Sequence, residues 1–307
     1  MQINSDNQNK ICVVTVFYKA EKHVEKFLAS LERNIESVSK MVIIDNNSND
    51  QALNIARSWC EKNNLELEYK INTENFGYTA AANMGIKLAE KDFHFILLTN
   101  NDLTLAKGTL ETLLDDIILS EADVMGIPGK SNDSEVFFGF NHKESYLKLT
   151  KFMQIRKSYM DFLLTRNVNY FPCDFPSGLM MLFSKSFFQK LGYFDEELFF
   201  SGDETDFAIR VSKNKNTKAF VSLRAYDLVD HVSFSTSGNS LIKNKNYVRG
   251  YVYILLKHTD KIFSVRYWAR LFYFVATIVY ERPSYTPFLL YHTLLSTFEF
   301  RKIYKYK

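Results

Sequence analysis

The eight residues Phe95-Ile-Leu-Leu-Thr-Asn-Asn-Asp102 carry the strongest structural signal in the chain. Four apolar residues run without a polar break, and the chain then turns into two asparagines and an aspartate. Such a run predicts a strand buried on both faces, as in a parallel sheet covered by helices. Ligands of open α/β sheets bind outside the carboxyl ends of the strands, so we expect a site at Asp102. Its oxygen atoms suit Mg²⁺ or Mn²⁺ bound with a phosphate, although Asn and Asp also form ordinary strand-ending turns.

Strand and helix patterns alternate on both sides of this run. Strands are expected at 11–17, 41–44 and 65–71, with helices at 20–37, 50–61 and 80–90. This order predicts a doubly wound α/β fold, whose right-handed crossovers would place Asp45, Gly77 and Asp102 near one edge of the sheet. Farther along, the pattern predicts helices at 110–119 and 186–191, a short strand at 124–128 and, over 175–183, a turn that enters another buried strand, whereas 129–170 is irregular.

Composition and cysteine usage limit the class of protein. The 307 residues are 46% apolar, enough for one large packed domain or two smaller ones. The cysteines Cys12, Cys60 and Cys173 fit neither a zinc site nor a disulfide framework, which favours a reducing compartment. The polar start is unlike a signal peptide, and the longest apolar run, 271–280, is too short to span a bilayer. We therefore expect a cytoplasmic protein.

Charge is distributed unevenly along the chain. Residues 241–307 include twelve Lys or Arg and three Asp or Glu, a net charge of +9, whereas the first 240 residues carry −6. The same tail is rich in Tyr and contains Trp268. We expect a helical extension that packs on the core and contacts an anionic membrane surface peripherally. Nucleic acid ranks lower as a partner of this basic aromatic surface, because no nucleic-acid-binding motif is present.

A second polar cluster lies in Gly202-Asp-Glu-Thr-Asp-Phe-Ala-Ile-Arg210. Acidic residues at a helix start are common, since they favour the helix dipole. Three carboxylates within four residues also repel one another, which raises at least one pKa and can produce a general base near neutral pH. An ion pair between Asp206 and Arg210 would leave Asp203 as that base, while Glu204 orients a substrate or caps the helix.

A third cluster is Asp230-His231, which precedes a loop rich in Ser, Thr and Gly. A lone histidine is usually a satisfied structural residue. At a strand end beside such a loop it can instead ligate a metal or contact a phosphate. Both readings stay open from these residues alone.

The order of these motifs resembles the inverting family-2 glycosyltransferases with a GT-A fold, in particular the bacterial rhamnosyltransferase and galactofuranosyltransferase-like members. The resemblance covers about residues 10–240. Any one motif is weak, but five in the right order and spacing are strong. The matching segments are Val13-Val-Thr-Val-Phe17, Ile44-Asp-Asn-Asn-Ser-Asn-Asp50, Asn75-x-Gly77-x-x-x-x-x-Asn83-x-Gly85, Thr99-Asn-Asn-Asp102 and Gly202-Asp-Glu-Thr-Asp206-x-x-x-Arg210.

The resemblance implies roles for the matching positions. The base and ribose of a nucleotide sugar would be held at the first two strand ends, and the remaining donor contacts would lie in the loop and helix beneath the nucleotide. Asp102 and His231 would hold the metal, although Asn100 stands where the family has an acid. Asp203 or Glu204 matches the catalytic base. The donor-binding residues implied are Thr15, Asp45, Asn75, Gly77, Asn83, Asn100, Asn101 and Arg210.

The resemblance also implies a domain plan. Residues 1–240 would form a GT-A (Rossmann-like) α/β domain with a mixed central sheet, and 241–307 the mainly helical extension. The nucleotide-binding half would span about 10–125 and the acceptor half about 126–240.

The activity implied is an inverting sugar transfer that uses Mg²⁺ or Mn²⁺. A sugar of the rhamnose or galactofuranose type would pass from a UDP- or dTDP-sugar to a lipid-linked saccharide. The setting would be synthesis of a bacterial surface polysaccharide, such as O-antigen or capsule, at the inner face of the membrane. The rival is a non-catalytic nucleotide-sugar-binding or scaffolding module, which Asn100 favours. The retained carboxylates speak against it, since a binding module needs no base.

Overall fold

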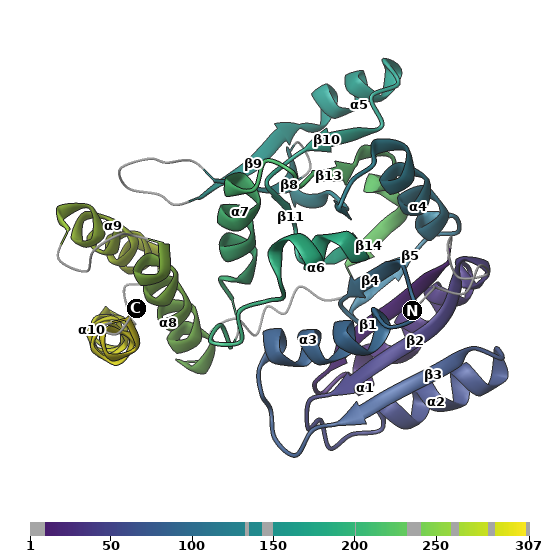
Figure 1. Ribbon diagram of the computed structural model, residues 1–307, viewed down its shortest axis with the longest axis horizontal. Helices are drawn as coiled ribbons and strands as arrows, with labels where there is room; N and C mark the ends of the chain where they lie inside the picture. Colours follow the sequence, from purple (N-terminus) through teal and green to yellow (C-terminus); the bar gives the residue numbers. More distant parts are fainter. Residues whose placement is uncertain are drawn as a thin grey trace.

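The computed structural model describes residues 10–132, 135–142, 150–199, 201–231, 241–258, 264–281 and 286–304. Within these residues, an eight-stranded sheet with the order β10-β13-β6-β12-β4-β1-β2-β3 organises the chain (Figure 1). Its strands are β1 (Ile11–Phe17), β2 (Val38–Asp45), β3 (Glu66–Ile71), β4 (Phe95–Thr99), β6 (Val124–Gly126), β10 (Tyr170–Pro172), β12 (Met180–Ser184) and β13 (Ala219–Ser222).

The sheet is mixed. β4, β1, β2 and β3 run parallel to one another, whereas β12 is antiparallel to both β4 and β6. The stretch that ends in Asp102 forms β4 in the middle of the sheet, and all five residues of the strand are buried. The expected buried strand and mixed α/β fold are confirmed.

Helices cover both faces of the sheet. Successive strand residues face opposite sides, so Val14 and Ile44 belong to one apolar core while Val13 and Ile43 belong to the other. The first core also takes side chains from α3 (Tyr78–Ala89), α6 (Lys185–Leu191) and α7 (Asp203–Lys213). The second takes side chains from α1 (Glu21–Glu32), α2 (Ala52–Lys62) and α4 (Thr109–Ser120).

One predicted helix is divided in the structure, whereas a predicted turn and strand are present as expected. The helix expected over 20–37 ends at Glu32 and is followed by the 3₁₀ turn η2 (Ile35–Ser37), because the side-chain amide of Asn34 donates to the carbonyl oxygens of Ser30 and Ala106 instead of continuing the helix. The turn and buried strand expected over 175–183 are present: β11 (Phe175–Pro176) is followed by a turn at 177–179 and by β12. That turn borders the candidate site.

The described strands of the irregular segment 129–170 form most of a smaller antiparallel sheet. These strands are β7 (Gly129–Asn132), β8 (Glu135–His142) and β9 (Thr150–Arg156), and β11 adds the fourth. The helix α5 (Lys157–Thr165) follows β9. A two-stranded pair joins β5 (Leu103–Leu105) to β14 (Val229–His231), which follows the 3₁₀ turn η3 (Leu223–Leu228). This pair brings the chain after 222 back beside Asp102.

The C-terminal extension is helical, as expected. It contains α8 (Leu241–His258), α9 (Val265–Glu281) and α10 (Thr286–Tyr304), which gather beyond α7 (Figure 1). Their apolar core includes Leu198 and Ile209 from the sheet domain, so the extension packs against that domain. Among the described residues no helix is long and apolar enough to cross a membrane. The predicted domain boundaries at 125/126 and 240/241 stay predictions.

Candidate active site

A pocket of about 450 Å³ opens where β1, β2 and β4 end. Most of its walls come from the loops that follow these strands and from the start of α3. A residue of α8 closes it, although α8 is far away in sequence. The lining residues are Val16, Tyr18, Asn46, Asn75, Gly77, Tyr78, Asn100, Asn101, Asp102, Phe199 and Asn246.

The Asn46 side chain holds one wall together. Its Nδ2 atom donates to Asn75 Oδ1 at 2.8 Å and to Gly77 O at 3.1 Å. Its Oδ1 atom accepts from Asn72 Nδ2 at 3.0 Å and from Phe76 N at 3.1 Å. One buried amide therefore fixes the loop 72–77 against the end of β2.

Gly77 forms the corner between this loop and α3. Its φ and ψ angles are +88° and 167°, a region that essentially only glycine adopts and that costs a residue with a side chain about 1–3 kcal/mol. A Cβ atom at this position would lie 2.6 Å from Phe199 O, the acceptor of the bond from Tyr78 N. The glycine thus lets the segment that carries Phe199 rest on the start of α3.

Gly77→Ala should destabilise the protein by more than a left-handed α conformation alone does. Gly108 is the comparison for that cost, because it is left-handed α, with φ +83° and ψ 1°, and a Cβ atom there meets open space. Gly108→Ala should lower the free energy of unfolding by about 1–2 kcal/mol. Gly77→Ala should lower it further, since its backbone region is less accessible to L-residues and the contact with Phe199 O must also be relieved. Urea unfolding of both variants measures the difference, and equal losses would show that neither the backbone region of Gly77 nor its contact with Phe199 adds to the cost.

Two carboxylates lie beside the pocket at the start of α7. Glu204 Oε1 accepts a 2.7 Å hydrogen bond from Gly178 N, in the turn between β11 and β12. The next residue of that turn, Leu179, accepts a 3.1 Å bond from Asn100 N at the end of β4. The turn therefore links the acidic pair to the Asn-Asn-Asp triplet.

The environment favours protonation of both carboxyls. Burial raises the pKa of Asp203, and the charge of Asp206 adds to this, although the amides of Asp203 and Glu204 act in the opposite direction. Burial and the charge of Asp203 raise the pKa of Glu204 against the effect of the Gly178 amide. Burial and both carboxylates in turn raise the pKa of the pocket residue Tyr78. The charges of the acidic pair therefore reach the wall of the pocket at Tyr78.

The predicted metal residues are brought together along the backbone. His231 pairs with Leu103 in the β14–β5 ladder, directly after Asp102. Asn101 Nδ2 donates to Val16 O at 2.8 Å, which leaves the amide oxygen of Asn101 as an acceptor. Among the described residues no three His, Cys, Asp or Glu side chains group closely enough to hold a metal by themselves. One carboxylate with amide oxygens fits Mg²⁺ or Mn²⁺ that is shared with a diphosphate.

Comparison with known proteins agrees with this geometry. The family model described as Glycosyl transferase family 2 matches residues 12–192, more than half of the chain. The chain belongs to that family. The low-salt glycan biosynthesis hexosyltransferase Agl10 of Haloferax volcanii is 26% identical over 216 residues, which are 66% of this chain and 62% of that protein. The poly(ribitol-phosphate) β-N-acetylglucosaminyltransferase TarS of Staphylococcus aureus is 26% identical over 184 residues, 57% of this chain and 32% of TarS. The chain thus spans less than two thirds of each of these relatives.

Solved structures show the same fold at low identity. S. aureus TarS 1–349 in complex with UDP has a TM-score of 0.53 and 18% identity over 90% of this chain and 74% of that chain. GalNAc-T7 with UDP, GalNAc and Mn²⁺ has a TM-score of 0.59 and 16% identity over 92% and 59%. The mannosyltransferase PcManGT of Pyrobaculum calidifontis, in complex with GDP-Man and Mn²⁺, has a TM-score of 0.56 and 13% identity over 98% and 88%. The GT-A fold expected from the sequence is confirmed.

Within this family-2 domain, five of the predicted donor-binding and metal residues line the pocket and four others, Thr15, Asp45, Asn83 and Arg210, do not, whereas the side chain of His231 lies outside the described residues. The five are Asn75, Gly77, Asn100, Asn101 and Asp102. Thr15 is fully buried, because it faces the opposite side of β1 from the pocket residue Val16. Asp45 stands next to pocket residue Asn46, where its Oδ1 atom accepts from Ser48 N at 2.7 Å. Asn83 is buried and bonds Phe194 and Glu196, so it anchors a loop instead of contacting the pocket.

Arg210 also differs from its predicted place among the donor contacts. Its guanidinium pairs with Asp206 at 2.8 Å and donates to the carbonyl oxygens of Leu191 and Tyr193. The predicted Asp206–Arg210 pair is therefore present. Arg210 is engaged in these contacts and is not among the residues that line the pocket.

The pocket also contains residues that the sequence reasoning did not select. Val16, Tyr18 and Asn46 lie at the ends of β1 and β2, the position at which open α/β sheets bind ligands. Phe199 comes from the loop before α7, and Asn246 from α8. Nothing in the local sequence of the last two residues indicates the pocket, because only the packing of α8 brings them there.

Proposed function

We propose that the protein is an inverting glycosyltransferase that uses a UDP- or dTDP-sugar. The acceptor we propose is a lipid-linked saccharide in bacterial surface-polysaccharide synthesis. The motif pattern favours a rhamnose or galactofuranose donor, whereas the relative TarS transfers N-acetylglucosamine according to its name. All three donors belong in the first screen.

The observation that carries the proposal is the hydrogen-bonded link between the pocket and the acidic pair. A strand-end pocket for a nucleotide alone would suit a binding module equally well. Here Gly178 and Leu179 connect Glu204 to Asn100 through two backbone hydrogen bonds, and Tyr78 borders both regions. Carboxyls whose pKa is raised beside a pocket fit a general base, and a binding module has no use for one.

The reaction we propose is a single displacement. Asp203 takes the proton from the acceptor hydroxyl as that oxygen forms a bond to the anomeric carbon. The bond from this carbon to the nucleoside diphosphate breaks on the opposite face, so the configuration inverts and the electron pair leaves with the diphosphate. Glu204, held by the Gly178 amide, would orient the acceptor.

The leaving diphosphate gathers negative charge, so positive charge or hydrogen-bond donors must face it. Asp102, with the amides of Asn100 and Asn101 and with His231, would hold a divalent cation there, which supplies positive charge to the leaving group. GalNAc-T7 and PcManGT were solved with Mn²⁺, which supports the same cofactor for this chain.

A donor screen tests the function. The protein is incubated with Mn²⁺ and with UDP-N-acetylglucosamine, UDP-galactofuranose or dTDP-rhamnose, and released nucleoside diphosphate is measured. We expect release from one of them, slowly to water and faster when a saccharide acceptor is added. Tight binding of one donor without release from any would favour the non-catalytic module.

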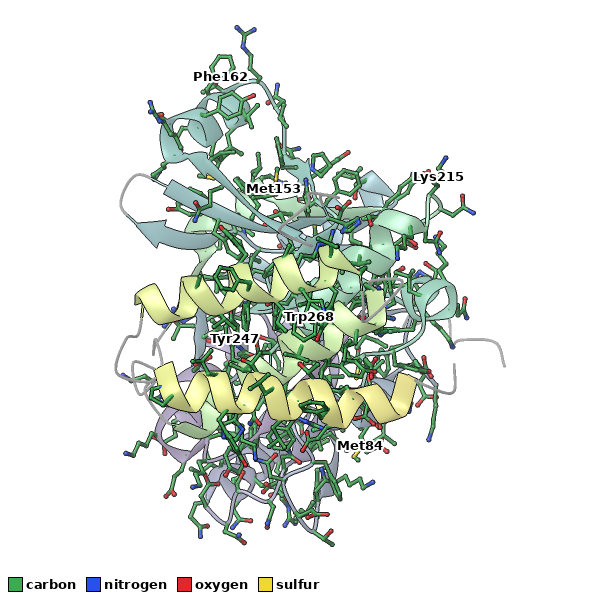
Figure 2. All side chains as sticks on the ribbon, turned by 90° about the vertical axis from the view of Figure 1, so that its left-hand side faces the viewer. Met84, Met153, Phe162, Lys215, Tyr247 and Trp268 are labelled. Atoms are coloured by element: carbon green, nitrogen blue, oxygen red, sulfur yellow. The ribbon has the colours of Figure 1, made fainter. Side chains whose placement is uncertain are left out.

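We further propose that the extension rests on an anionic membrane. Exposed apolar side chains form a stripe along α9, where Val265, Trp268 and Phe272 are 75%, 45% and 76% exposed. A second stripe on α10 contains Leu290, Tyr291, Leu294 and Phe298. Figure 2 shows α9 and α10 side by side on the outer face of the molecule, with Trp268 labelled. Interfacial aromatics beside a tail with a net charge of +9 suit an anionic lipid surface.

Binding to vesicles should need both the charge and the stripe. The protein should co-sediment with vesicles that contain phosphatidylglycerol and much less with pure phosphatidylcholine. High salt should weaken the binding, since each base near the surface contributes about 1 kcal/mol and is screened. The double variant Trp268→Ser, Phe272→Ser should bind at least about tenfold more weakly, because two large apolar side chains lose their burial.

The double variant Tyr159→Ser, Phe162→Ser is the matched control, since these two aromatic residues on α5 are equally accessible at 49% each. It should bind vesicles like the wild type. Equal binding to neutral and anionic vesicles would rule out the electrostatic part, and an unaffected Trp268/Phe272 variant would rule out the stripe.

A further inference from the structure

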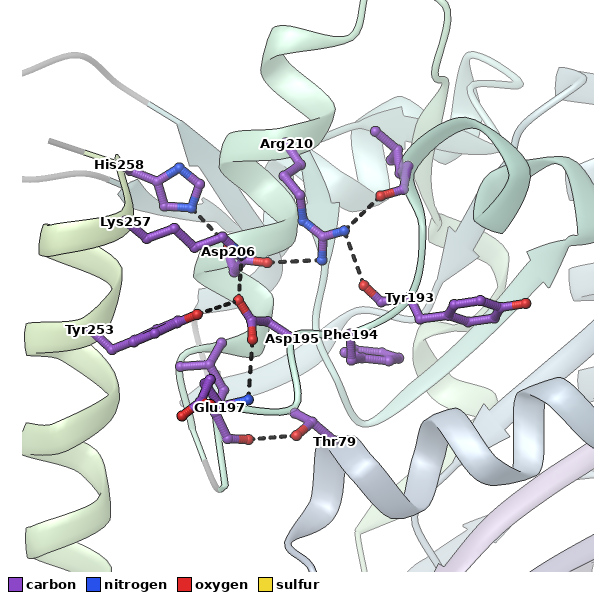
Figure 3. A network of polar contacts seen from close by, with 12 residues as sticks. Thr79, Tyr193, Phe194, Asp195, Glu197, Asp206, Arg210, Tyr253, Lys257 and His258 are labelled. Atoms are coloured by element: carbon purple, nitrogen blue, oxygen red, sulfur yellow. Dashed lines mark hydrogen bonds and ion pairs between the residues drawn. The ribbon is translucent and has the colours of Figure 1, made fainter. Parts of the chain in front are cut away.

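A buried polar cluster joins the helical extension to the catalytic helix α7 (Figure 3). Asp206 lies at its centre with 1% of its side chain exposed. Its Oδ1 atom contacts Lys257 Nζ at 2.6 Å and His258 Nε2 at 2.8 Å, and its Oδ2 atom contacts Arg210 at 2.8 Å. Burial alone would raise the pKa of Asp206, but His258, Arg210 and Lys257 hold it well below its ordinary value.

The charges of the cluster balance when His258 is neutral. Burial lowers the pKa of His258 more than its bond to Asp206 raises it. Two cations, Lys257 and Arg210, then face two carboxylates, Asp206 and Asp195. Removal of either cation would leave a buried carboxylate without full compensation.

Lys257 is the cation that bridges two separate segments. Besides Asp206, its Nζ atom contacts Asp195 Oδ2 at 2.7 Å, and Tyr253 of the same helix donates to that oxygen at 2.8 Å. Asp195 orders its own loop by accepting from Glu197 N at 3.1 Å and from Leu198 N at 3.0 Å. Lys257 therefore holds the loop 193–199 against α7.

Both segments border the candidate active site. The loop donates no side chain to chemistry, but it ends in the pocket residue Phe199 and accepts bonds from Thr79 and Tyr78 at the start of α3. α7 begins with Asp203 and Glu204, one helical turn before Asp206. A shift at the cluster would thus change the distance between the acidic pair and the pocket wall.

The helix α8 lies close enough to prevent such a shift. A Cβ atom at Gly250 would lie 2.7 Å from Ser201 O, and one at Gly202 would lie 2.6 Å from Ile254 Cδ1. Two glycines, one on each side, therefore allow α8 to approach the segment that leads into α7. Asn246 on the same helix reaches the pocket itself.

We propose that Lys257 is a positioning residue for the transfer reaction, and that α8 is a structural part of the active site. By holding Asp195 and Asp206 together, Lys257 fixes the acidic pair relative to the donor pocket. This inference rests on the proposed function, because it takes Asp203 and Glu204 as the reacting carboxylates. A misplacement of about 1 Å in such a site can cost roughly 100-fold in rate.

The test is Lys257→Met in the full-length protein, with Lys218→Met as the control. Lys218 forms a 2.9 Å ion pair with Glu121, but both side chains are exposed and neither belongs to the buried cluster around Asp206. Lys257→Met should lower kcat by about 10- to 100-fold, change the Kd for UDP less than about threefold, and speed amide exchange in residues 198–206. Lys257→Arg, whose planar fork can contact two carboxylates, should restore part of kcat. Lys218→Met should match the wild type in all these readouts.

Two further outcomes keep the test decisive. If Lys257→Met does not fold, Tyr253→Phe removes only one hydroxyl from Asp195 and should still lower kcat by about threefold or more. Unchanged kcat and unchanged exchange in a folded Lys257→Met protein would overturn the proposal, as would a purely thermal destabilisation with normal kinetics. Amide exchange at 198–206 also separates this inference from the proposed function. It reports whether Lys257 holds Asp195 and Asp206 together even if the wild type transfers no sugar.

Discussion

Asp203→Asn should lower kcat by about 10² to 10⁴, the usual contribution of a positioned general base. The substitution keeps the size of the side chain and its ability to accept from the amides at the start of α7, but it removes basicity. Asp203 is the first choice because its charge has a stronger effect on the pocket residue Tyr78 than the charge of Glu204. The Kd for UDP should change little, since Asp203 does not line the pocket.

Glu204→Gln is the matched control, because a glutamine oxygen can still accept from Gly178 N. It should cost less than Asp203→Asn. If Glu204→Gln is the inactive variant and Asp203→Asn stays active, the roles of the two residues are exchanged. If both stay active, the cluster does not supply the base.

The raised pKa of both carboxyls has consequences for pH and stability. A base works only when deprotonated, so wild-type kcat should fall on the acid side at a higher pH than for an ordinary carboxyl. Charging these groups in the folded protein is unfavourable, so their contribution to stability is lost as the pH rises through the raised pKa. Asp203→Asn should therefore have a higher Tm than the wild type at pH 8, which distinguishes lost chemistry from lost folding.

Asp102→Ala should abolish turnover and remove the gain in UDP affinity that Mn²⁺ provides. Asp102 is the acidic member of the triplet at the end of β4, and it lines the pocket. The loss of one contact from a charged group is worth roughly 1.5–3 kcal/mol, about 10- to 100-fold in Kd. Calorimetry of UDP binding with and without Mn²⁺ measures the effect.

Asn100→Asp is the reciprocal variant. It adds a second carboxylate beside Asp102 and should increase the gain in UDP affinity that Mn²⁺ provides. Metal-dependent binding that is undiminished in Asp102→Ala would show that the cation is held elsewhere or is not used.

The parts of the molecule that follow local rules were predictable from the sequence. The uninterrupted run before Asn100 predicted β4, and helical spacing predicted α1 to α4 and α7 within a few residues. Gly77 in the loop between β3 and α3 was expected near the ligand from the crossovers of the sheet and from the family motif, and the structure gives it a positive φ next to a close backbone contact. These features depend on neighbours in the chain.

The remainder depends on packing between distant segments. Thr15 and Val16 are adjacent in sequence, and only the register of β1 decides which of them faces the pocket. Asn83 matched a motif position, but its amide bonds Phe194 and Glu196, more than a hundred residues later. Asn246 and Lys257 reach the site through the docking of α8, which no spacing in the sequence encodes.

The central claim is that the carboxylates beside the pocket perform chemistry on the ligand that the pocket binds. The most direct test is release of nucleoside diphosphate by the wild type and by the double variant Asp203→Asn, Glu204→Gln, with the Kd for UDP measured on the same samples. We predict equal UDP binding by both proteins, release from one donor by the wild type, and release at least about 10²-fold slower by the double variant. Equal release by both proteins, or tight binding by the wild type with no release from any donor, would contradict the account.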